Sequence, residues 1–305
     1  MSRDFLAVSD LGFEGLARVL ELAAAVKKDP QRFAGRLSGR TVGLFFEKPS
    51  TRTRVSCEVA SVDLGAHPVV LKRDEIGLGS REAVEDVARV LDRYLDVLAF
   101  RVFSHAHLET IAANADAPVI NLLSDLSHPC QALADLQTIA EHRPLAGTRL
   151  AYVGDGNNVA HSLMVSGAMA GMSVVVATPE GHEPAESVMA RAEELGATTG
   201  ADLEITNDPE VAVAGADVVY TDVWASMGDE GDAERRREYF RRFHIDERMF
   251  SLAADDAIFL HCLPAHRGEE VSHEVLEHER SFVFDQAENR MHSFKALLLY
   301  VTGKA

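Results

Sequence analysis

Short apolar segments rich in Val, Ile and Phe alternate with longer segments whose apolar residues recur at helical spacing. The short runs predict buried strands and the longer ones predict helices. The predicted strands cover residues 41–46, 68–71, 97–101, 118–121, 149–153, 173–177, 217–221 and 257–260. The predicted helices between them cover residues 81–93, 131–142, 158–171, 183–195 and 208–214. Two further segments, 11–26 and 287–301, have the pattern of amphipathic helices.

This alternation predicts an α/β fold with mainly parallel sheets. Eight strands also suit a closed barrel, but the polar clusters are spaced more like those of two consecutive open sheets. A division at residues 143–147 (Arg-Pro-Leu-Ala-Gly) separates about four strands from about four more. We therefore predict two open, mainly parallel-sheet α/β domains with helices on both faces, joined by interdomain helices. The first covers residues 1–135, with the C-terminal helix 287–305 packing back on it, and the second covers 145–286.

Composition and net charge limit the partners and the cellular location that we expect for the protein. The 305 residues are 47% hydrophobic and 26% charged, as in ordinary soluble globular proteins. A net charge of −18 argues against nucleic acid as a general partner, although local arginines can still bind a small anion. We expect no membrane span, no signal peptide and no zinc site, and we predict a cytoplasmic protein with free thiols at Cys57, Cys130 and Cys262.

Residues 46–54 (Phe-Glu-Lys-Pro-Ser-Thr-Arg-Thr-Arg) follow the first predicted strand and open a helix-like segment. Pro49 suits a helix start, and Ser50 and Thr51 are N-cap types. A helix amino terminus has free N–H groups and the positive end of the dipole. With two hydroxyls and two guanidinium groups, this turn suits phosphate or carboxylate. The alternative is a capped helix whose arginines lie in solvent.

Further polar residues follow other predicted strands, where active sites of open α/β sheets lie. Arg101 ends one strand. His128 and Gln131, three residues apart at a helix start, can form a donor pair for a carbonyl oxygen, although a histidine there is often structural. Residues 154–158 (Gly-Asp-Gly-Asn-Asn) only superficially match a dinucleotide loop.

The ends of later predicted strands carry two more candidate site residues, an acid and a thiol. Asp222, an acceptor for a cationic amine, begins Asp-Val-Trp-Ala-Ser-Met-Gly. Cys262 precedes a Leu-Pro pair, a type of bond that adopts cis in tight turns. This cysteine suits a nucleophile, a ligand-positioning group or a small buried residue. Arg290 begins the last helix.

Together these motifs resemble the aspartate/ornithine carbamoyltransferase family along the whole chain. The matching stretches are Ser50-Thr51-Arg52-Thr53-Arg54, His128-Pro129-Cys130-Gln131, Asp222 to Gly228, His261-Cys262-Leu263-Pro264 and Glu288-Asn289-Arg290. The first two are shared with aspartate carbamoyltransferases and specify only carbamoyl phosphate. The stretches that contain Asp222 and Cys262 look like the ornithine branch.

The resemblance implies a role for each matched residue, and it makes residues 1–135 the carbamoyl-phosphate-binding domain and 145–286 the ornithine-binding domain. Carbamoyl phosphate would be bound by Ser50, Thr51, Arg52, Thr53, Arg101, His128, Gln131, Cys262, Leu263 and Arg290. Ornithine would be bound by Asn158, Asp222, Ser226 and Met227, with Cys262 and Leu263 facing its δ-amine. The implied catalytic residues are Arg52, Arg101, His128 and Cys262.

The implied reaction is attack of the neutral δ-amine of L-ornithine on the carbamoyl carbon, giving L-citrulline and phosphate in arginine biosynthesis. Cationic groups would stabilise the charge on the carbonyl oxygen and the departing phosphate. The family needs neither metal nor organic cofactor and is a homotrimer in which a loop reaches the neighbouring site. This chain departs from the pattern in that loop, where Gly77 replaces Gln, so that Ser80 or Arg81 would take over part of its role. Cys57, often Phe in the family, indicates a packing change.

Two alternatives remain. One is a relative that carbamoylates putrescine or acetylornithine, against which the intact Ser226-Met227-Gly228 turn argues. The other is a non-catalytic protein that binds carbamoyl phosphate without turning it over.

Overall fold

The computed structural model describes residues 4–225 and 233–305. The chain divides into two compact units, Met1–Gln137 with Glu288–Ala305, and Thr138–Ala287. It leaves the first unit within α6 (Pro129–His142) and returns to it within α13 (Val283–Val301). The helices that join the two units are therefore continuous across both crossings.

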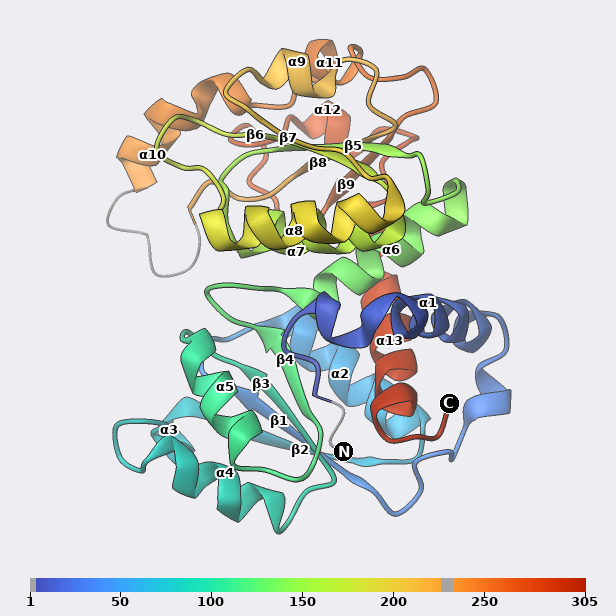
Figure 1. Ribbon diagram of the computed structural model, residues 1–305, viewed down its shortest axis with the longest axis vertical. Coiled ribbons are helices and arrows are strands. Elements are labelled where there is room, and N and C mark those ends of the chain that lie inside the picture. The colour runs from blue at the N-terminus through green and yellow to red at the C-terminus, as the bar shows by residue number, and fades with distance from the viewer. Residues whose placement is uncertain (1–3, 226–232) are drawn as a thin grey trace. The chain divides into compact units, whose positions relative to one another are not determined.

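The first unit contains a parallel sheet in the order β2-β1-β3-β4. Its strands are β1 (Thr41–Phe46), β2 (His67–Lys72), β3 (Val97–Arg101) and β4 (Val119–Leu123). Helices α4 (Val84–Asp92) and α5 (His105–Ala113) lie on one side of the sheet, and α2 (Thr51–Asp63) and α13 lie on the other (Figure 1). Two more helices, α1 (Gly12–Lys28) and α3 (Arg73–Ile76), complete the unit.

The second unit contains a parallel sheet in the order β7-β6-β5-β8-β9. Its strands are β5 (Arg149–Val153), β6 (Ser173–Ala177), β7 (Leu203–Thr206), β8 (Val218–Thr221) and β9 (Ile258–His261). Helices α7 (Asn158–Ala170) and α8 (Glu186–Thr199) lie on one face (Figure 1). The others are α9 (Pro209–Val213), α10 (Ala233–Phe240), α11 (Glu247–Phe250) and α12 (His273–Leu276).

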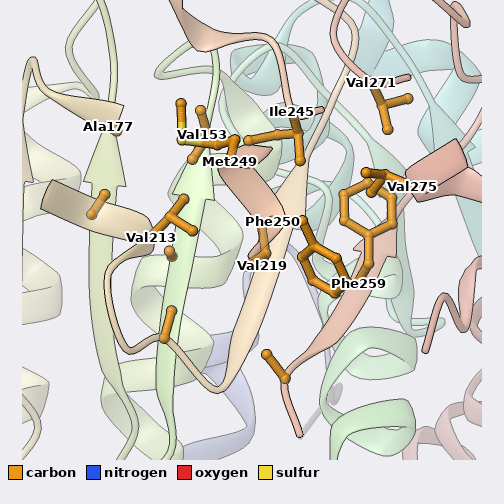
Figure 2. Packing of buried hydrophobic residues seen from close by; sticks show 14 of the residues in the cluster. Val153, Ala177, Val213, Val219, Ile245, Met249, Phe250, Phe259, Val271 and Val275 are labelled. Atoms are coloured by element: carbon orange, nitrogen blue, oxygen red, sulfur yellow. The ribbon is translucent and has the colours of Figure 1, made fainter. Parts of the chain in front are cut away.

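Side chains that point to one face of the sheet, at alternate positions along its strands, build the core of the second unit. Val153, Val219 and Phe259 point from three neighbouring strands to the face opposite α7 (Figure 2). There they pack against residues of α9, α11 and α12, among them Val213 and Phe250. In the first unit an equivalent cluster lies between the sheet and α4 and α5. Burial of these side chains, worth about 1.5–3 kcal/mol each, fixes the strands whose ends carry the polar residues.

The predicted fold class, two parallel α/β sheets with helices, is confirmed. Each predicted strand is present, but the sequence analysis missed β7. This edge strand, Leu-Glu-Ile-Thr, lacks a fully buried residue, so it has no continuous apolar run. The apolar residues that predicted α2 do not form the face of the helix that packs on the core. Val55, Val59 and Val62 are 53%, 40% and 60% exposed, and the buried face consists of smaller residues such as Cys57 and Ala60.

Strand order identifies one special position in each sheet. In the first unit β1 is flanked by β2 and β3, so the connections after β1 and β3 leave the sheet in opposite directions. In the second unit the same reversal lies between β5 and β8. Ligands of open α/β sheets bind beyond the carboxyl ends of strands at such switch points. Residues that follow β1, β3, β5 and β8 are therefore the candidates for ligand binding.

Candidate active site

The amino terminus of α2 lies directly after β1. Ser50 is its N-cap in extended conformation, and its Oγ accepts from the Thr53 backbone N–H at 3.4 Å. The Ser50 hydroxyl also donates to Thr53 Oγ1 at 3.1 Å, and Thr53 is buried. Thr51 and Arg52 occupy the exposed side of the same turn. The predicted N-cap is confirmed, and the turn presents hydroxyl and N–H groups as an anion site requires.

The two arginines of this turn differ in their surroundings. Arg54 Nε donates to Glu58 Oε1 at 2.6 Å, an i,i+4 ion pair in which Arg54 is 49% exposed. The solvated-arginine alternative therefore describes Arg54. Arg52 lies close enough to the buried His128 for its charge to act on that imidazole. The charge of Arg52 thus acts on another predicted residue, whereas Arg54 pairs with Glu58.

Arg101 is the last residue of β3 and lies in register with Phe46, the last residue of β1. The pairing of β3 with β4 shifts by one residue between Phe100 and Arg101. Such an irregularity re-aims a side chain at the end of a strand. Arg101 is only 7% exposed, and its charge, like that of Arg52, acts on His128.

A buried chain of hydrogen bonds joins α13, α6 and α2. Arg290 Nη1 donates to Gln131 Oε1 at 2.5 Å, and Arg290 Nη2 donates to Thr53 Oγ1 at 3.4 Å. The Gln131 amide donates in turn to Asp135 Oδ1 at 2.7 Å. The structure thus brings together four predicted residues, Ser50, Thr53, Gln131 and Arg290, from distant parts of the sequence. It adds Asp135, which the sequence analysis missed although it lies four residues after Gln131 on the same helix.

His128 immediately precedes α6 and follows a compact loop. The Asn121 side-chain amide ties this loop together by donating to Leu6 O at 2.9 Å and Ser124 Oγ at 3.2 Å. Burial lowers the pKa of His128 well below its usual value, and the nearby charges of Arg290, Arg101 and Arg52 lower it further. The imidazole is consequently neutral at neutral pH. A neutral ring retains one N–H donor without adding charge to three guanidinium groups.

A cavity of about 370 Å³ adjoins this turn at the ends of β1 and β2. Ser50, Thr51 and Arg54 line it together with Lys72, the last residue of β2, and Arg73, the first residue of α3. It is large enough for a small anion. It shares only Ser50 and Thr51 with the predicted carbamoyl-phosphate set, so the cavity alone does not define that set.

In the second unit, Asp222 follows β8 and meets residues from two other strand ends. Cys262 Sγ donates to Asp222 Oδ1 at 2.9 Å, and Asn157 Nδ2 donates to Asp222 Oδ2 at 3.0 Å. Asn157 is also the N-cap of α7, accepting from Val159 and Ala160, and Asn158 is the first residue of that helix. The predicted Asp222, Cys262 and Asn158 therefore lie in one region. Asn157 was missed, although its residue type just before a helix is an N-cap signal.

The turn after β9 is built on His261. Its Nδ1 accepts from the Leu263 N–H at 2.8 Å, so the proton lies on Nε2, which is 3.2 Å from Glu270 Oε1. Both His261 and Glu270 are fully buried. Leu263 has a φ of 57° and precedes Pro264 through a cis peptide bond, as the Leu-Pro pair suggested. Glu270, a further missed residue, thus holds the turn that presents Cys262 and Leu263.

The second glycine of the Gly-Asp-Gly-Asn-Asn loop has a local explanation. A Cβ on Gly156 would lie 2.4 Å from both the His182 carbonyl oxygen and the Pro184 nitrogen. The Gly156 N–H donates to that same His182 oxygen at 2.9 Å. In dinucleotide-binding proteins the corresponding close approach is made by the pyrophosphate. Here the protein's own backbone occupies that place, so the glycine gives no support to nucleotide binding.

Within the described part of the chain, two groups present three metal-ligand atoms within 4.8 Å of one another. They are Asp222 with His261 and Cys262, and His266 with Glu269 and Glu270. Both ring nitrogens of His261 are engaged, by Leu263 and Glu270. The first group therefore forms a hydrogen-bonded network in this arrangement.

Two predicted residues, Ser226 and Met227, lie outside the described residues. Over 4–225 and 233–305, no helix combines the length and the apolar character needed to cross a bilayer.

Family models account for nearly the whole sequence. The carbamoyl-P binding domain of aspartate/ornithine carbamoyltransferases matches residues 3–141, and the Asp/Orn binding domain matches residues 146–301. These two matches define a class of two-domain carbamoyl-group transferases. The chain belongs to the aspartate/ornithine carbamoyltransferase family.

Individual relatives indicate to which branch of the family the chain is most similar. An ornithine carbamoyltransferase of Acidothermus cellulolyticus is 55% identical over 100% of this chain and 98% of its own length. The solved ornithine carbamoyltransferase of Pyrococcus furiosus is 49% identical, with a TM-score of 0.96 over 99% of this chain and 97% of its own. A solved N-acetyl-L-ornithine transcarbamylase mutant is less similar, 31% identical with a TM-score of 0.88 over 97% and 98%.

Proposed function

We propose that this enzyme transfers the carbamoyl group of carbamoyl phosphate to the δ-amine of L-ornithine, giving L-citrulline and phosphate in arginine biosynthesis. The observation that carries the proposal is the buried set at the amino terminus of α2. There Arg290 joins Gln131 to Thr53 beside the capped turn that holds Arg52. A helix amino terminus with guanidinium groups beside it stabilises a doubly charged phosphate.

In the first unit, the carbamoyl-phosphate-binding domain, the α2 turn binds the phosphate group. Ser50, Thr51, Arg52 and Thr53 provide hydroxyl, N–H and guanidinium donors. Arg101 contacts both the phosphate and the carbonyl oxygen. His128, Gln131 and Arg290 complete the contacts to the carbamoyl group. Because His128 is neutral, it contributes a hydrogen bond, and the positive charge that stabilises the oxyanion comes from the arginines.

In the second unit, the ornithine-binding domain, Asp222 and Asn158 bind the amino-acid end of ornithine together with Ser226 and Met227. Cys262 and Leu263, in the turn after β9, face the δ-amine and the donor. The amine attacks in its neutral form, the bond from the carbamoyl carbon to the phosphate oxygen breaks, and the amine loses a proton. The substrate amine is mostly protonated in water, and Asp222 and Cys262 are placed to influence the loss of its proton.

Cys262 acts in this scheme as a hydrogen-bonding group. Its thiol donates to the Asp222 carboxylate, a bond that a protonated sulfur makes. The donor is already activated, so no carbamoyl-enzyme intermediate is needed.

We also propose a homotrimer in the cytoplasm. Support for assembly comes from Val55, Val59 and Val62, an apolar stripe exposed on α2. Contiguous exposed apolar residues on one helix face are typical of protein interfaces. Support for a reducing compartment comes from the three cysteines, all of which are free thiols.

A coupled assay for citrulline tests the reaction. The purified protein should form citrulline from carbamoyl phosphate and ornithine, with little or no product from lysine, aspartate, putrescine or acetylornithine. A stronger preference for putrescine or acetylornithine would assign a different amine to the same site. Carbamoyl phosphate binding without turnover of any amine would favour the non-catalytic alternative.

Two arginines on one turn provide a matched pair for the phosphate assignment. Arg52→Ala should lower kcat/KM by about a hundredfold or more, because it removes a charge that serves the leaving group. Arg54→Ala, which removes a half-exposed ion pair with Glu58, should change kcat/KM by less than about threefold. Steady-state kinetics, with thermal unfolding to confirm the fold, would contradict the assignment if both variants behaved alike.

A further inference from the structure

The loop between β5 and α7 and the end of β8 are joined by one guanidinium group. Arg236, on α10, donates from Nη1 to Asp155 Oδ2 at 2.8 Å and to the Trp224 carbonyl oxygen at 2.7 Å. Asp155 belongs to the β5–α7 loop, and Trp224 follows β8. The other Asp155 oxygen lies 3.4 Å from His182 Nδ1, in the loop after β6. Three strand-end loops are therefore connected through the Asp155–Arg236 pair.

This ion pair is better shielded than the surface pairs of the chain. The Arg236 and Asp155 side chains are 20% and 13% exposed. The guanidinium carbon lies 5.9 Å from the centre of the Phe240 ring, on which Trp224 stacks at 6.1 Å with an interplanar angle of 27°. A charge pair with reduced access to water is stronger and more directional than an exposed pair.

The two joined loops carry residues of the proposed ornithine site. Asn157, two residues after Asp155, donates to Asp222, which lies two residues before Trp224. The Asp155–Arg236–Trp224 contacts thus form a second bridge beside the Asn157–Asp222 hydrogen bond. The second bridge adds an ion pair that restrains the two loops carrying the Asn157 and Asp222 side chains.

We propose that Arg236 is a positioning residue that fixes the β5–α7 loop against the end of β8 and thereby sets the affinity for ornithine. The proposal rests on the proposed function. Arg236 itself need not touch the substrate. Its effect passes through Asp155 to Asn157 and Asn158, and through Trp224 to Asp222.

The kinetic test compares the effect of one substitution on the affinities for the two substrates. Arg236→Gln removes the charge and should raise KM for ornithine by about ten- to a hundredfold, because small displacements of binding groups are costly. The kcat at saturating ornithine should stay within about threefold, and the Kd for carbamoyl phosphate should not change. Arg237→Gln is the matched control, because Arg237 pairs with Glu269 at 3.0 Å and its side chain is 53% exposed.

The single tryptophan of the chain provides a direct readout. Trp224 is buried and its carbonyl accepts from Arg236, so its emission reports on the bridge. Arg236→Gln should shift the emission to longer wavelength and lower its anisotropy, and Arg237→Gln should not. Asp155→Asn should reproduce the Arg236→Gln changes, and the double variant should add little to either.

The proposal is overturned if Arg236→Gln leaves KM for ornithine within about twofold of the parent, or weakens both substrates equally. If Arg236→Gln does not fold, Asp155→Asn, which removes the same charge pair with little change in shape, decides by the same criteria. A parent enzyme that forms no citrulline would instead overturn the proposed function. In that case the Trp224 emission of the variants still decides whether the bridge exists.

Discussion

At the scale of single residues, His128 shows how burial sets the chemistry that a side chain offers. Its pKa lies well below the usual value, so the folded protein keeps the ring neutral while the unfolded chain takes up a proton below about pH 6.5. Stability should therefore be complete at neutral pH and fall as the pH drops through that range. The loss due to His128 should approach roughly 1 kcal/mol per pH unit below about pH 6.

Denaturant unfolding between pH 7.5 and 5.5 measures this loss. His128→Asn should give a smaller fall in the free energy of unfolding than the parent. The pKa of His292 is also lowered, chiefly by burial, so a residual dependence of the same sign should remain in the variant. A steeper fall in His128→Asn than in the parent would contradict the neutral imidazole.

At the scale of elements, the loop after β5 depends on Gly156. Gly156→Ala places a Cβ against the backbone at His182 and Pro184, which cannot move as a flexible side chain does. We expect a loss of about 1–3 kcal/mol in the free energy of unfolding and a higher KM for ornithine. Thermal or denaturant unfolding and steady-state kinetics measure the two effects.

Gly181→Ala is the comparison for this prediction. Its Cβ would meet open space, but its φ of 83° disfavours alanine. It should therefore lose about 1 kcal/mol and keep the parental KM for ornithine. Equal KM values in the parent and Gly156→Ala would show that the close packing of this loop does not serve the site.

The sequence predicted elements well where the local signals were strong. Pro49 and Ser50 marked the start of α2, and apolar runs marked every strand except the partly exposed β7. The residue pattern alone left Arg52 and Arg54 as equal candidates for the anion, and only the family resemblance chose Arg52. In the structure Arg54 pairs with Glu58, one turn further along the helix. The sequence analysis also missed Asn157, whose contact with Asp222 requires β5 and β8 to be neighbours, and strand order is not encoded locally. The roles of the site residues remain a prediction.

At the scale of the whole molecule, the stripe on α2 tests the assembly. Val59→Lys places a charge in the middle of the exposed apolar face and should dissociate the proposed trimer into smaller species. Light scattering coupled to size-exclusion chromatography measures the mass. Val211→Lys is the control, since Val211 is 51% exposed on α9 of the other unit. Trimers in both variants would exclude the stripe from the interface.

Composition and periodicity predicted two parallel α/β sheets, because each sheet is built from local strand and helix signals. They gave no means of placing Arg290 beside Thr53, since the two are separated by 237 positions and their contact depends on the return of α13 to the first unit. The motif resemblance supplied that link.

The late position of Arg290 has a consequence for biosynthesis of the enzyme. A nascent chain that has emerged only as far as residue 137 holds β1 to β4 and α2, but not the guanidinium that joins Gln131 to Thr53. The proposed carbamoyl-phosphate site is completed only after the intervening 150 residues, Thr138–Ala287, have been translated. On the proposed function, incomplete polypeptides therefore cannot sequester the activated donor, and this ability arises together with the domain that uses it.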